Sequence, residues 1–178
     1  KVNLSNGTSL VCTPSHDWVI QDGKGSRKVK AGRLVPGDKL YRFTMPIVDG
    51  GIDDKLAYSH GFYCGDGYLE HGERKVALLY GVKKELVPHL VGHTTGLLYN
   101  DGQDRMRFAF LPWMAEKFVV PMNYSIKSRL DWLAGIIDSD GCSVFSNNSV
   151  CIQISSSEKP FLDDIRLMLT TLGIQPVV

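Results

Sequence analysis

Apolar and small residues recur with helical spacing along residues 128–141, and this run ends in acids and a glycine. Such spacing predicts a helix with one buried face. Ser128 and Asp131 have the spacing of a capping box, which predicts that the helix begins at Ser128. Gly141 is predicted to end the helix in a left-handed backbone conformation, which glycine adopts without steric cost.

A stripe of small residues occurs on two predicted helices. Gly135 and Ser139 lie four residues apart and therefore share one helix face. Residues 59–67 repeat this spacing through Gly61 and Gly65. Small residues allow two helix backbones to approach closely, as they do in membrane helix pairs. The sequence therefore predicts that these two helices pack side by side through the small residues.

Both predicted helices end in a carboxylate, where the partial negative charge of a helix C-terminus disfavours acids. Asp66 and Asp140 each precede the final glycine, and Asp138 lies two residues before Asp140. Two carboxylates at one end of a helix pair repel each other unless a cation lies between them. Asp66 and Asp140 are therefore predicted to bind a divalent metal of the kind used in phosphodiester hydrolysis, and Asp138 to point elsewhere.

Short strands and turns are predicted along the first 45 residues. Asn6-Gly7 predicts a two-residue type I′ hairpin turn. The further elements predicted here are strands over 10–16 and 28–34, with turns at Gln21-Asp22-Gly23 and Val35-Pro36-Gly37-Asp38.

Hairpins and helices alternate in the rest of the chain. The predicted elements of 58–127 are strands over 68–70 and 75–80, a helix over 83–95 that contains Pro88, strands over 97–100 and 105–110, and a short helix over 112–119. After the second motif helix we expect strands over 143–145 and 150–155, then a helix capped by Ser157 and ended by Gly173, then a strand from Ile174. The residues predicted to form the buried face of that helix are Phe161, Ile165, Met168 and Leu172.

This order of elements predicts an α+β fold with two regions. Residues 1–45 form a partial all-β segment, and residues 46–57 are predicted to be a linker because they contain Asp49-Gly50-Gly51. Residues 58–178 form a second domain whose halves, 58–127 and 128–178, each begin with a small-residue helix. The second half is expected to be truncated, because it lacks a second hairpin.

Composition argues against a membrane-spanning protein and against a zinc site. The chain has 178 residues and a net charge of +1, with basic residues concentrated over 24–42, where they form a candidate phosphate-binding patch or an ordinary solvated face. No run approaches the ~18 apolar residues of a membrane span. The four cysteines are scattered without metal-binding spacing, so we expect reduced thiols in a cytoplasmic protein and no zinc site.

Leu133–Gly141 resembles the motif of LAGLIDADG homing endonucleases, with seven of nine letters shared. The first copy, Ser59–Gly67, shares three of nine. The resemblance implies an αββαββα half for each motif, with the two motif helices at the central seam. It also implies that Asp66 and Asp140 bind Mg²⁺ and that the substrate is a double-stranded DNA target site. Cys64 stands where the family often has an acid.

Basic residues on the strands of the first half are candidates for DNA contacts. Arg74, Lys75, Arg105 and Arg107 would bind phosphates or guanines if their side chains point outward from the sheet. Lys75 is also a candidate to stabilise the charge that develops at the phosphate, as family lysines near the centre do. Ordinary surface positions remain the alternative for each of them.

The N-terminal segment resembles the Hint fold of inteins and hedgehog autoprocessing domains. The resemblance rests on Thr13-x-x-His16 followed by Lys30-Ala31-Gly32 and Val35-Pro36-Gly37-Asp38. It implies that His16 polarises the scissile peptide bond at the N-terminal splice junction, with support from Thr13. The flanking host-protein segments (exteins) would be partners. Because the chain shows neither the first-residue Cys or Ser nor a final His-Asn, we expect a fragment, an incomplete sequence, or part of a split intein with a complementary piece.

Three functional interpretations follow from these patterns. The first is an intein segment with an inserted Mg²⁺-dependent DNA endonuclease. The second is a decayed endonuclease domain that persists as a scaffold, because only Lys159 and Arg166 supply positive charge after the second motif. The third is an RNA-binding maturase, against which the Hint-like segment argues.

Overall fold

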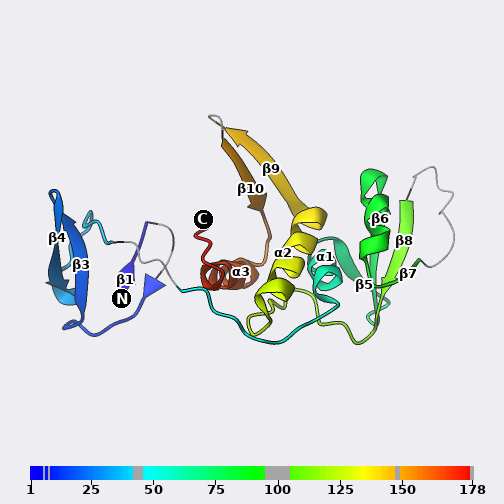
Figure 1. The fold of residues 1–178 in the computed structure, drawn as a ribbon, viewed down its shortest axis with the longest axis horizontal. Helices are drawn as coiled ribbons and strands as arrows, with labels where there is room; N and C mark the ends of the chain where they lie inside the picture. The colour runs from blue at the N-terminus through cyan, green and yellow to red at the C-terminus, as the bar shows by residue number, and fades with distance from the viewer. Residues whose placement is uncertain (6, 8, 42–45, 95–104, 147–148, 177–178) are drawn as a thin grey trace.

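Two helices that lie side by side form the centre of the molecule (Figure 1). The computed structural model describes residues 1–178 apart from 6, 8, 42–45, 95–104, 147–148 and 177–178. The two helices are α1 (Ala57–Asp66) and α2 (Ile126–Asp140). A Cβ atom on Gly61 would lie 1.9 Å from the Trp132 carbonyl oxygen, and one on Gly135 would lie 2.0 Å from that of Tyr58. The predicted close packing of the helices through small residues is therefore confirmed.

The two ends of α2 differ from their prediction. The helix begins after Ser125, whose Oγ accepts a hydrogen bond from the Ser128 backbone N–H at 3.2 Å, so Ser128 is not the capping residue. Gly141 is not left-handed: its φ of −79° leads directly into a strand. Glycine is needed there for space instead, because a Cβ atom would lie 2.6 Å from the Ile137 carbonyl oxygen.

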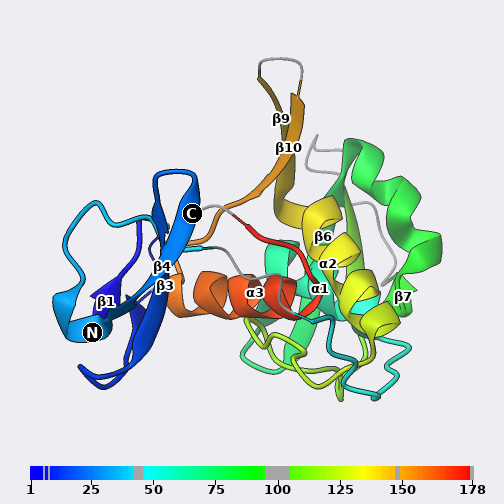
Figure 2. The same cartoon turned by 60° about the vertical axis from the view of Figure 1, so that its left-hand side comes forward.

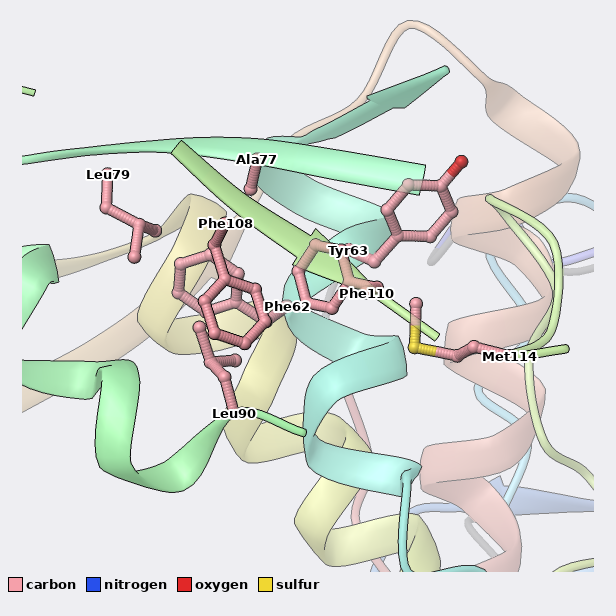
Figure 3. Close-up of a cluster of buried hydrophobic side chains, with 8 residues drawn as sticks. All are labelled: Phe62, Tyr63, Ala77, Leu79, Leu90, Phe108, Phe110 and Met114. Atoms are coloured by element: carbon pink, nitrogen blue, oxygen red, sulfur yellow. The ribbon is translucent and has the colours of Figure 1, made fainter. Parts of the chain in front are cut away.

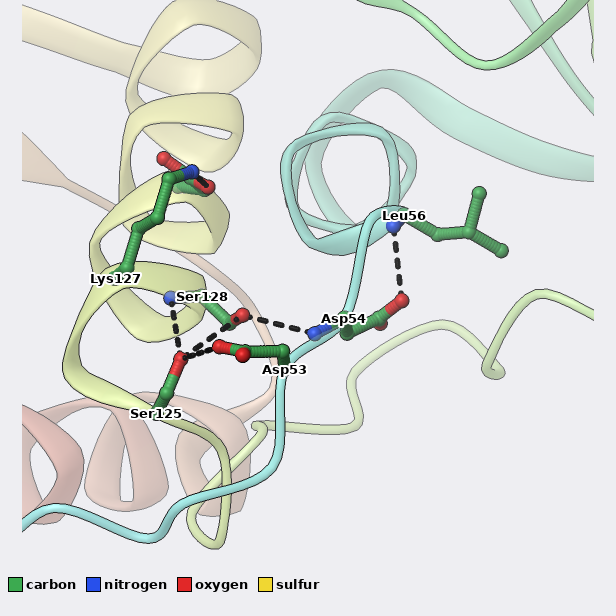
Figure 4. Close-up of polar contacts among 7 residues, drawn as sticks. Asp53, Asp54, Leu56, Ser125, Lys127 and Ser128 are labelled. Carbon is green, nitrogen blue, oxygen red and sulfur yellow. Dashed lines mark hydrogen bonds and ion pairs between the residues drawn. The ribbon is translucent and has the colours of Figure 1, made fainter.

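Polar contacts join the segment before α1 to the first turn of α2 (Figure 4). Ser125 Oγ donates to Asp53 Oδ1 at 2.6 Å, and the Asp54 backbone N–H donates to Ser128 Oγ at 2.9 Å. Asp54 Oδ1 in turn accepts from the Leu56 backbone N–H at 2.8 Å. The starts of the two helices are thus held together by hydrogen bonds that span more than 70 residues of sequence.

A four-stranded antiparallel sheet covers one side of α1. Its strands are β5 (Gly67–Glu70), β6 (Arg74–Tyr80), β8 (Arg105–Phe110) and β7 (Gly92–Thr94), in the order β5-β6-β8-β7. Its inner face packs on α1 and forms the cluster in Figure 3, which consists of Phe62, Tyr63, Ala77, Leu79, Leu90, Phe108, Phe110 and Met114. The predicted hairpin of β5 and β6 and the predicted strand over 105–110 are confirmed.

Three other predictions for this half need correction or lie outside the described residues. The helix expected over 83–95 is the 3₁₀ helix η2 (Gly81–His89) followed by β7, because Pro88 lacks the N–H that an α-helix needs. The expected helix over 112–119 is a series of turns, because the carbonyls of Pro112 and Met114 accept hydrogen bonds from Lys75. The strand expected over 97–100 falls on residues that the structure does not describe.

The second half carries a two-stranded hairpin and a long helix. The hairpin consists of β9 (Gly141–Ser146) and β10 (Ser149–Ile154), and α3 (Lys159–Thr171) lies beside α2 (Figure 2) and shares a buried core cluster with it. All four residues of the predicted buried face of α3 are buried, so that prediction is confirmed.

The ends of α3 are only partly as predicted. The helix starts after Glu158, so Ser157 does not cap it. Its predicted end is confirmed, because Gly173 has a φ of +76° and the Ile174 N–H donates to the Leu169 carbonyl at 2.9 Å. Residues 174–176 are not in a strand, contrary to the prediction.

The N-terminal residues form two small hairpins at one end of the molecule (Figures 1 and 2). They are β1 (Val2–Asn3) with β2 (Ser9–Leu10), and β3 (Asp17–Asp22) with β4 (Gly25–Lys30), followed by the 3₁₀ turn η1 (Ala31–Arg33). In the first hairpin Asn3 pairs with Ser9. The two-residue turn predicted at Asn6-Gly7 includes Asn6, which lies outside the described residues.

Boundaries in this segment shift by a few residues. The strand expected over 10–16 ends at Leu10. The turn predicted at Gln21-Asp22-Gly23 lies at residues 23–24 instead, because Gln21 and Asp22 belong to β3 and Asp22 pairs with Gly25. The strand expected over 28–34 is β4 and ends at Lys30. The turn at 35–38 is confirmed by the hydrogen bond from the Asp38 N–H to the Val35 carbonyl at 3.1 Å.

The segment predicted to be a linker is attached to the helices along its length. The Val48 N–H donates to the Thr171 carbonyl at 2.9 Å, and the Ser125 N–H donates to the Ile52 carbonyl at 2.7 Å. The buried Arg129 side chain bonds to both Val48 and Thr171. Residues 46–57 therefore belong structurally to the helical part, and the division into domains remains a prediction.

No helix among the described residues combines the length and the apolar character needed to cross a membrane. All four cysteines are free.

We expect Gly61→Ala or Gly135→Ala to lower the free energy of unfolding by about 1–3 kcal/mol, because each added Cβ atom meets the backbone of the other helix. Urea unfolding followed by Trp132 fluorescence measures this. The matched control is Ala134→Leu, which adds more volume at an exposed position of α2 and should change stability by less than about 0.5 kcal/mol. Equal effects at positions 134 and 135 would contradict the close packing.

Candidate metal and nucleic-acid site

The last residues of α1 and α2 bring two carboxylates to the same end of the helix pair. Asp66 ends α1 and Asp140 ends α2. A Cβ atom on Gly65 would lie 3.0 Å from Asp140 Cβ, which shows how closely the two helix ends approach. Asp66 is half-buried, whereas Asp140 is exposed. The structure therefore brings together the two acids that the sequence motifs selected.

The pKa of Asp66 lies above its usual range. The main cause is burial, and the negative charge of Asp140 adds to it, whereas hydrogen bonding and charge from Lys83 act in the opposite direction. A carboxyl group whose ionisation is disfavoured by burial and by a neighbouring acid gains from a bound cation.

Lys83 connects the two acidic helix ends. Its Nζ donates to Asp66 Oδ2 at 2.5 Å and to the Ser139 carbonyl oxygen at 2.5 Å. Ser139 immediately precedes Asp140, so this one ammonium group contacts both motif helices. Lys83 lies on η2, where the prediction of an amphipathic helix assigned it no role.

Lys117 makes a second contact of this kind. Its Nζ donates to the Gly65 carbonyl at 3.1 Å and also to the Gly67 carbonyl. The carbonyls at a helix C-terminus carry partial negative charge, which a lysine stabilises. The sequence assigned no role to either lysine, and its one candidate for stabilising charge at the reaction centre was Lys75. Neither Lys83 nor Lys117 has a local sequence pattern that distinguishes it.

The remaining motif positions point away from the two acids. Asp138 accepts a hydrogen bond from the Tyr58 hydroxyl of the other helix at 2.7 Å. Burial, and secondly this contact, raises the pKa of Tyr58 well above its usual range. Burial raises the pKa of the Cys64 thiol to about 12, so the thiol stays neutral. Asp138 thus points elsewhere as expected, and Cys64 does not replace a missing acid.

The donor set at the helix ends suits a hard divalent cation. Among the described residues no group of three or more His, Cys, Asp or Glu side chains converges on one point. Mg²⁺ does not require such a group, because it commonly binds one or two carboxylates and keeps several waters. Asp66 and Asp140 supply two carboxylates, and the Ser139 carbonyl already binds a cationic group.

Lys75 does not lie where it was predicted. It is 6% exposed, and its Nζ donates to the Pro112 carbonyl at 3.0 Å and to the Met114 carbonyl at 2.6 Å and pairs with Glu116 at 2.8 Å. Successive strand residues point to opposite faces, so Arg74 and Lys75 cannot both face a ligand. The prediction that Lys75 contacts DNA or the phosphate at the reaction centre is wrong in this structure, because its ammonium group anchors the 112–116 turns.

The three predicted arginines lie on the outer face of the sheet, but their surroundings differ. Arg74 is exposed. Arg107 is 12% exposed and forms a two-point ion pair with Glu70, in which its Nε lies 3.0 Å from Glu70 Oε1. Arg105 is partly buried and pairs in register with Tyr80. Only Arg74 of the three therefore presents an open basic side chain.

A hollow of about 500 Å³ opens on this outer face next to Asp66 and Lys83. It is lined by Asp66, Tyr68, Leu78, Tyr80, Gly81, Val82 and Lys83. Its aromatic and apolar walls lie beside the acidic end of α1.

Thr13 and His16 lie far along the chain from the acids, on a turn before β3. The Ala31 N–H donates to the His16 carbonyl at 2.8 Å, and the Gly32 N–H donates to the Pro14 carbonyl at 2.9 Å. The two sequence blocks of the Hint resemblance are therefore in direct contact. Both side chains are exposed, with Thr13 Oγ1 3.3 Å from Ser15 Oγ and the His16 ring edge-on to Trp18.

Comparisons with known proteins agree with part of this interpretation. Residues 128–178 match the family model described as LAGLIDADG-like domain, which supports a homing-endonuclease-type domain there. The chain is also similar to the ribonucleoside-diphosphate reductase large subunit of Invertebrate iridescent virus 6. The two are 38% identical over 193 aligned positions that cover 98% of this chain and 20% of that protein. The chain thus spans about a fifth of the length of this relative.

We expect Lys75→Met to lower the free energy of unfolding by about 1–3 kcal/mol, because the part-buried Pro112 carbonyl and the buried Met114 carbonyl lose this donor. Chemical denaturation measures the effect. Arg74→Met, at the exposed neighbouring position, is the matched control and should change stability by less than about 0.5 kcal/mol. Equal stability of the Lys75 and Arg74 variants would contradict the buried position of the Lys75 side chain.

Proposed function

We propose that this chain is a segment of an intein that carries a Mg²⁺-dependent DNA endonuclease of the LAGLIDADG type. The observation that supports the endonuclease most directly is the meeting of Asp66 and Asp140 at one end of two closely packed helices. A structural helix pair does not need an acid at each C-terminus, because both acids oppose the helix dipoles there.

Asp66 and Asp140 would hold the metal, and the DNA would lie across the outer face of the sheet. Mg²⁺ bound there would supply an activated water and balance the negative charge of the phosphate. Lys83, beside Asp66, supplies positive charge close to the same phosphate. Arg74 would bind the DNA backbone farther out, and the hollow lined by Tyr68 and Tyr80 would contact the duplex next to the cleaved bond.

The intein part of the proposal rests on the N-terminal hairpins. His16 and Thr13 lie on a turn that is hydrogen-bonded to residues 31–32, as expected if both blocks belong to one splicing site. A reductase large subunit that aligns with this chain over a fifth of its own length is what we would expect if the segment lies within a longer host enzyme. A reductase of that kind is therefore our candidate for the host protein.

Specific ion pairs favour a second candidate, a decayed endonuclease domain that serves as a scaffold. In the second half, Lys159 and Arg166 both pair with Asp163, so neither offers its charge freely to DNA. In the first half, Lys75 is buried and Arg107 pairs with Glu70. This candidate would keep the metal-binding acids and lose turnover.

We expect Asp66→Asn and Asp140→Asn each to reduce nicking of a supercoiled plasmid that carries the intein-free host site by about a hundredfold or more, with the fold retained. Nicking with Mg²⁺ is measured on gels and folding by circular dichroism. Asp131→Asn, at the other end of α2, is the matched control. Undiminished cutting by both site variants would refute the two-acid site, and an inactive parent chain that still binds metal would favour the scaffold.

We expect His16→Ala, in a precursor that contains this segment between its host-protein flanks, to slow cleavage at the N-terminal junction by about a hundredfold, the usual contribution of a general acid. Gel analysis of cleavage products over time measures the rate. Lys28→Ala on β4 is a control at an exposed position of the same hairpin. An unchanged rate in the His16 variant would remove His16 from the splicing chemistry.

A further inference from the structure

The ammonium group of Lys83 occupies the space between the oxygens of the two motif helices. It lies 2.5 Å from Asp66 Oδ2 and 2.5 Å from the Ser139 carbonyl oxygen. The Lys83 side chain is one-third exposed and that of Asp66 23% exposed, so both groups are partly withdrawn from water. A contact of this kind is stronger than one between fully exposed side chains.

The oxygens that Lys83 binds are also suitable ligands for a hard divalent cation. Mg²⁺ and Mn²⁺ prefer carboxylate and carbonyl oxygens, at about 2.0–2.1 Å for Mg²⁺. A cation at that distance from Asp66 Oδ2 would lie almost in contact with an ammonium group bound to the same oxygen. Two positive charges so close repel each other strongly in a partly buried site. The ammonium group and a metal therefore cannot both bind Asp66 in this arrangement.

We propose that Lys83 is a built-in competitor of the divalent metal, which binds only when the lysine leaves Asp66 Oδ2 and the Ser139 carbonyl. This inference rests on the proposed metal site at Asp66 and Asp140. Without metal, Lys83 neutralises Asp66 and bridges the two helix ends, which would otherwise repel each other. Binding of metal releases the ammonium group toward the hollow beside it, where a DNA phosphate would attract it.

Lys117 differs from Lys83 in a way that separates competition from general electrostatics. It donates to the carbonyls of Gly65 and Gly67. Its effect on the pKa of Asp66 comes only from its charge. Loss of Lys83 frees a carboxylate oxygen, whereas loss of Lys117 removes one donor from two carbonyls and frees no carboxylate oxygen. Competition is therefore assigned to Lys83 alone.

The test is the affinity of the whole chain for Mn²⁺ without DNA, measured by isothermal titration calorimetry and by the electron paramagnetic resonance signal of free Mn²⁺. Loss of one positive charge from the chain should by itself help metal binding slightly, so a variant that loses one lysine charge away from the site is needed as a control. Lys127→Met is that control, because Lys127 pairs with Asp131 at the far end of α2 and is 80% exposed.

We expect Lys83→Met to bind Mn²⁺ about five- to tenfold more tightly than the parent chain. Lys127→Met should stay within about twofold of the parent, because its charge is distant and screened. Lys83→Arg, which keeps a cation beside Asp66, should not gain affinity. Lys83→Gln serves as a second neutral variant if Lys83→Met does not fold, as judged by circular dichroism.

Adding Asp66→Asn to the parent chain and to Lys83→Met separates failure of this inference from failure of the proposed function. If Asp66→Asn weakens binding in the parent chain but Lys83→Met and Lys83→Gln bind no more tightly than the parent, the metal site stands and the competitor role is overturned. If Asp66→Asn changes nothing in either background, the proposed metal site itself is overturned, and the competitor role with it.

Discussion

The close approach of α1 and α2 is the constraint on which the candidate site depends. Gly61 and Gly135 each leave space for a backbone carbonyl of the opposite helix, and Gly65 leaves space for Ser139. A larger side chain at any of these positions would push the helices apart. Because the two backbones touch, the last residues of both helices lie at the same end of the helix pair. Two acids more than 70 residues apart in sequence, Asp66 and Asp140, therefore lie close together.

This packing concentrates negative charge at one end of the helix pair, and lysines from the first half of the chain neutralise that charge. Two helix C-termini and two acids place negative charge and carbonyl dipoles in one small volume. Lys83 and Lys117 neutralise them from η2 and from the turns after β8, and Lys75 holds those turns in place through buried carbonyl contacts. The cations near the acids thus come from residues 58–127, although the acids come from both halves.

The two halves differ in how much surface they offer to a partner. The first half has a four-stranded sheet with aromatic and basic side chains on its outer face. Among the described residues, the second half has only the β9–β10 hairpin, whose apolar side chains Phe145, Val150 and Ile152 are largely exposed. A DNA duplex bound across the pair would therefore meet most of its polar and basic contacts on the first half.

Local patterns in the sequence were sufficient to predict several elements. The small-residue spacing predicted the helix pair, the apolar spacing from Phe161 to Leu172 predicted the buried face of α3, and Gly173 predicted its end. Each of these depends on residues within a few positions of one another, where helical periodicity and the conformational freedom of glycine dominate. The pairing of Asp66 with Asp140 was also predictable, because it follows from two helices in contact.

Tertiary structure decided the rest, because the deciding contacts join residues far apart in the chain. The strand that holds Lys75 could point that side chain outward or inward. The packing of Ala77 and Leu79 against α1, together with the contacts to 112–116, sets the direction. Lys83 had no distinguishing local pattern; its role arises because η2 lies over the ends of both motif helices. The sequence by itself determined which acids meet, and the folded chain determined which cations meet them, since charge neutralisation depends on position in space rather than on spacing along the chain.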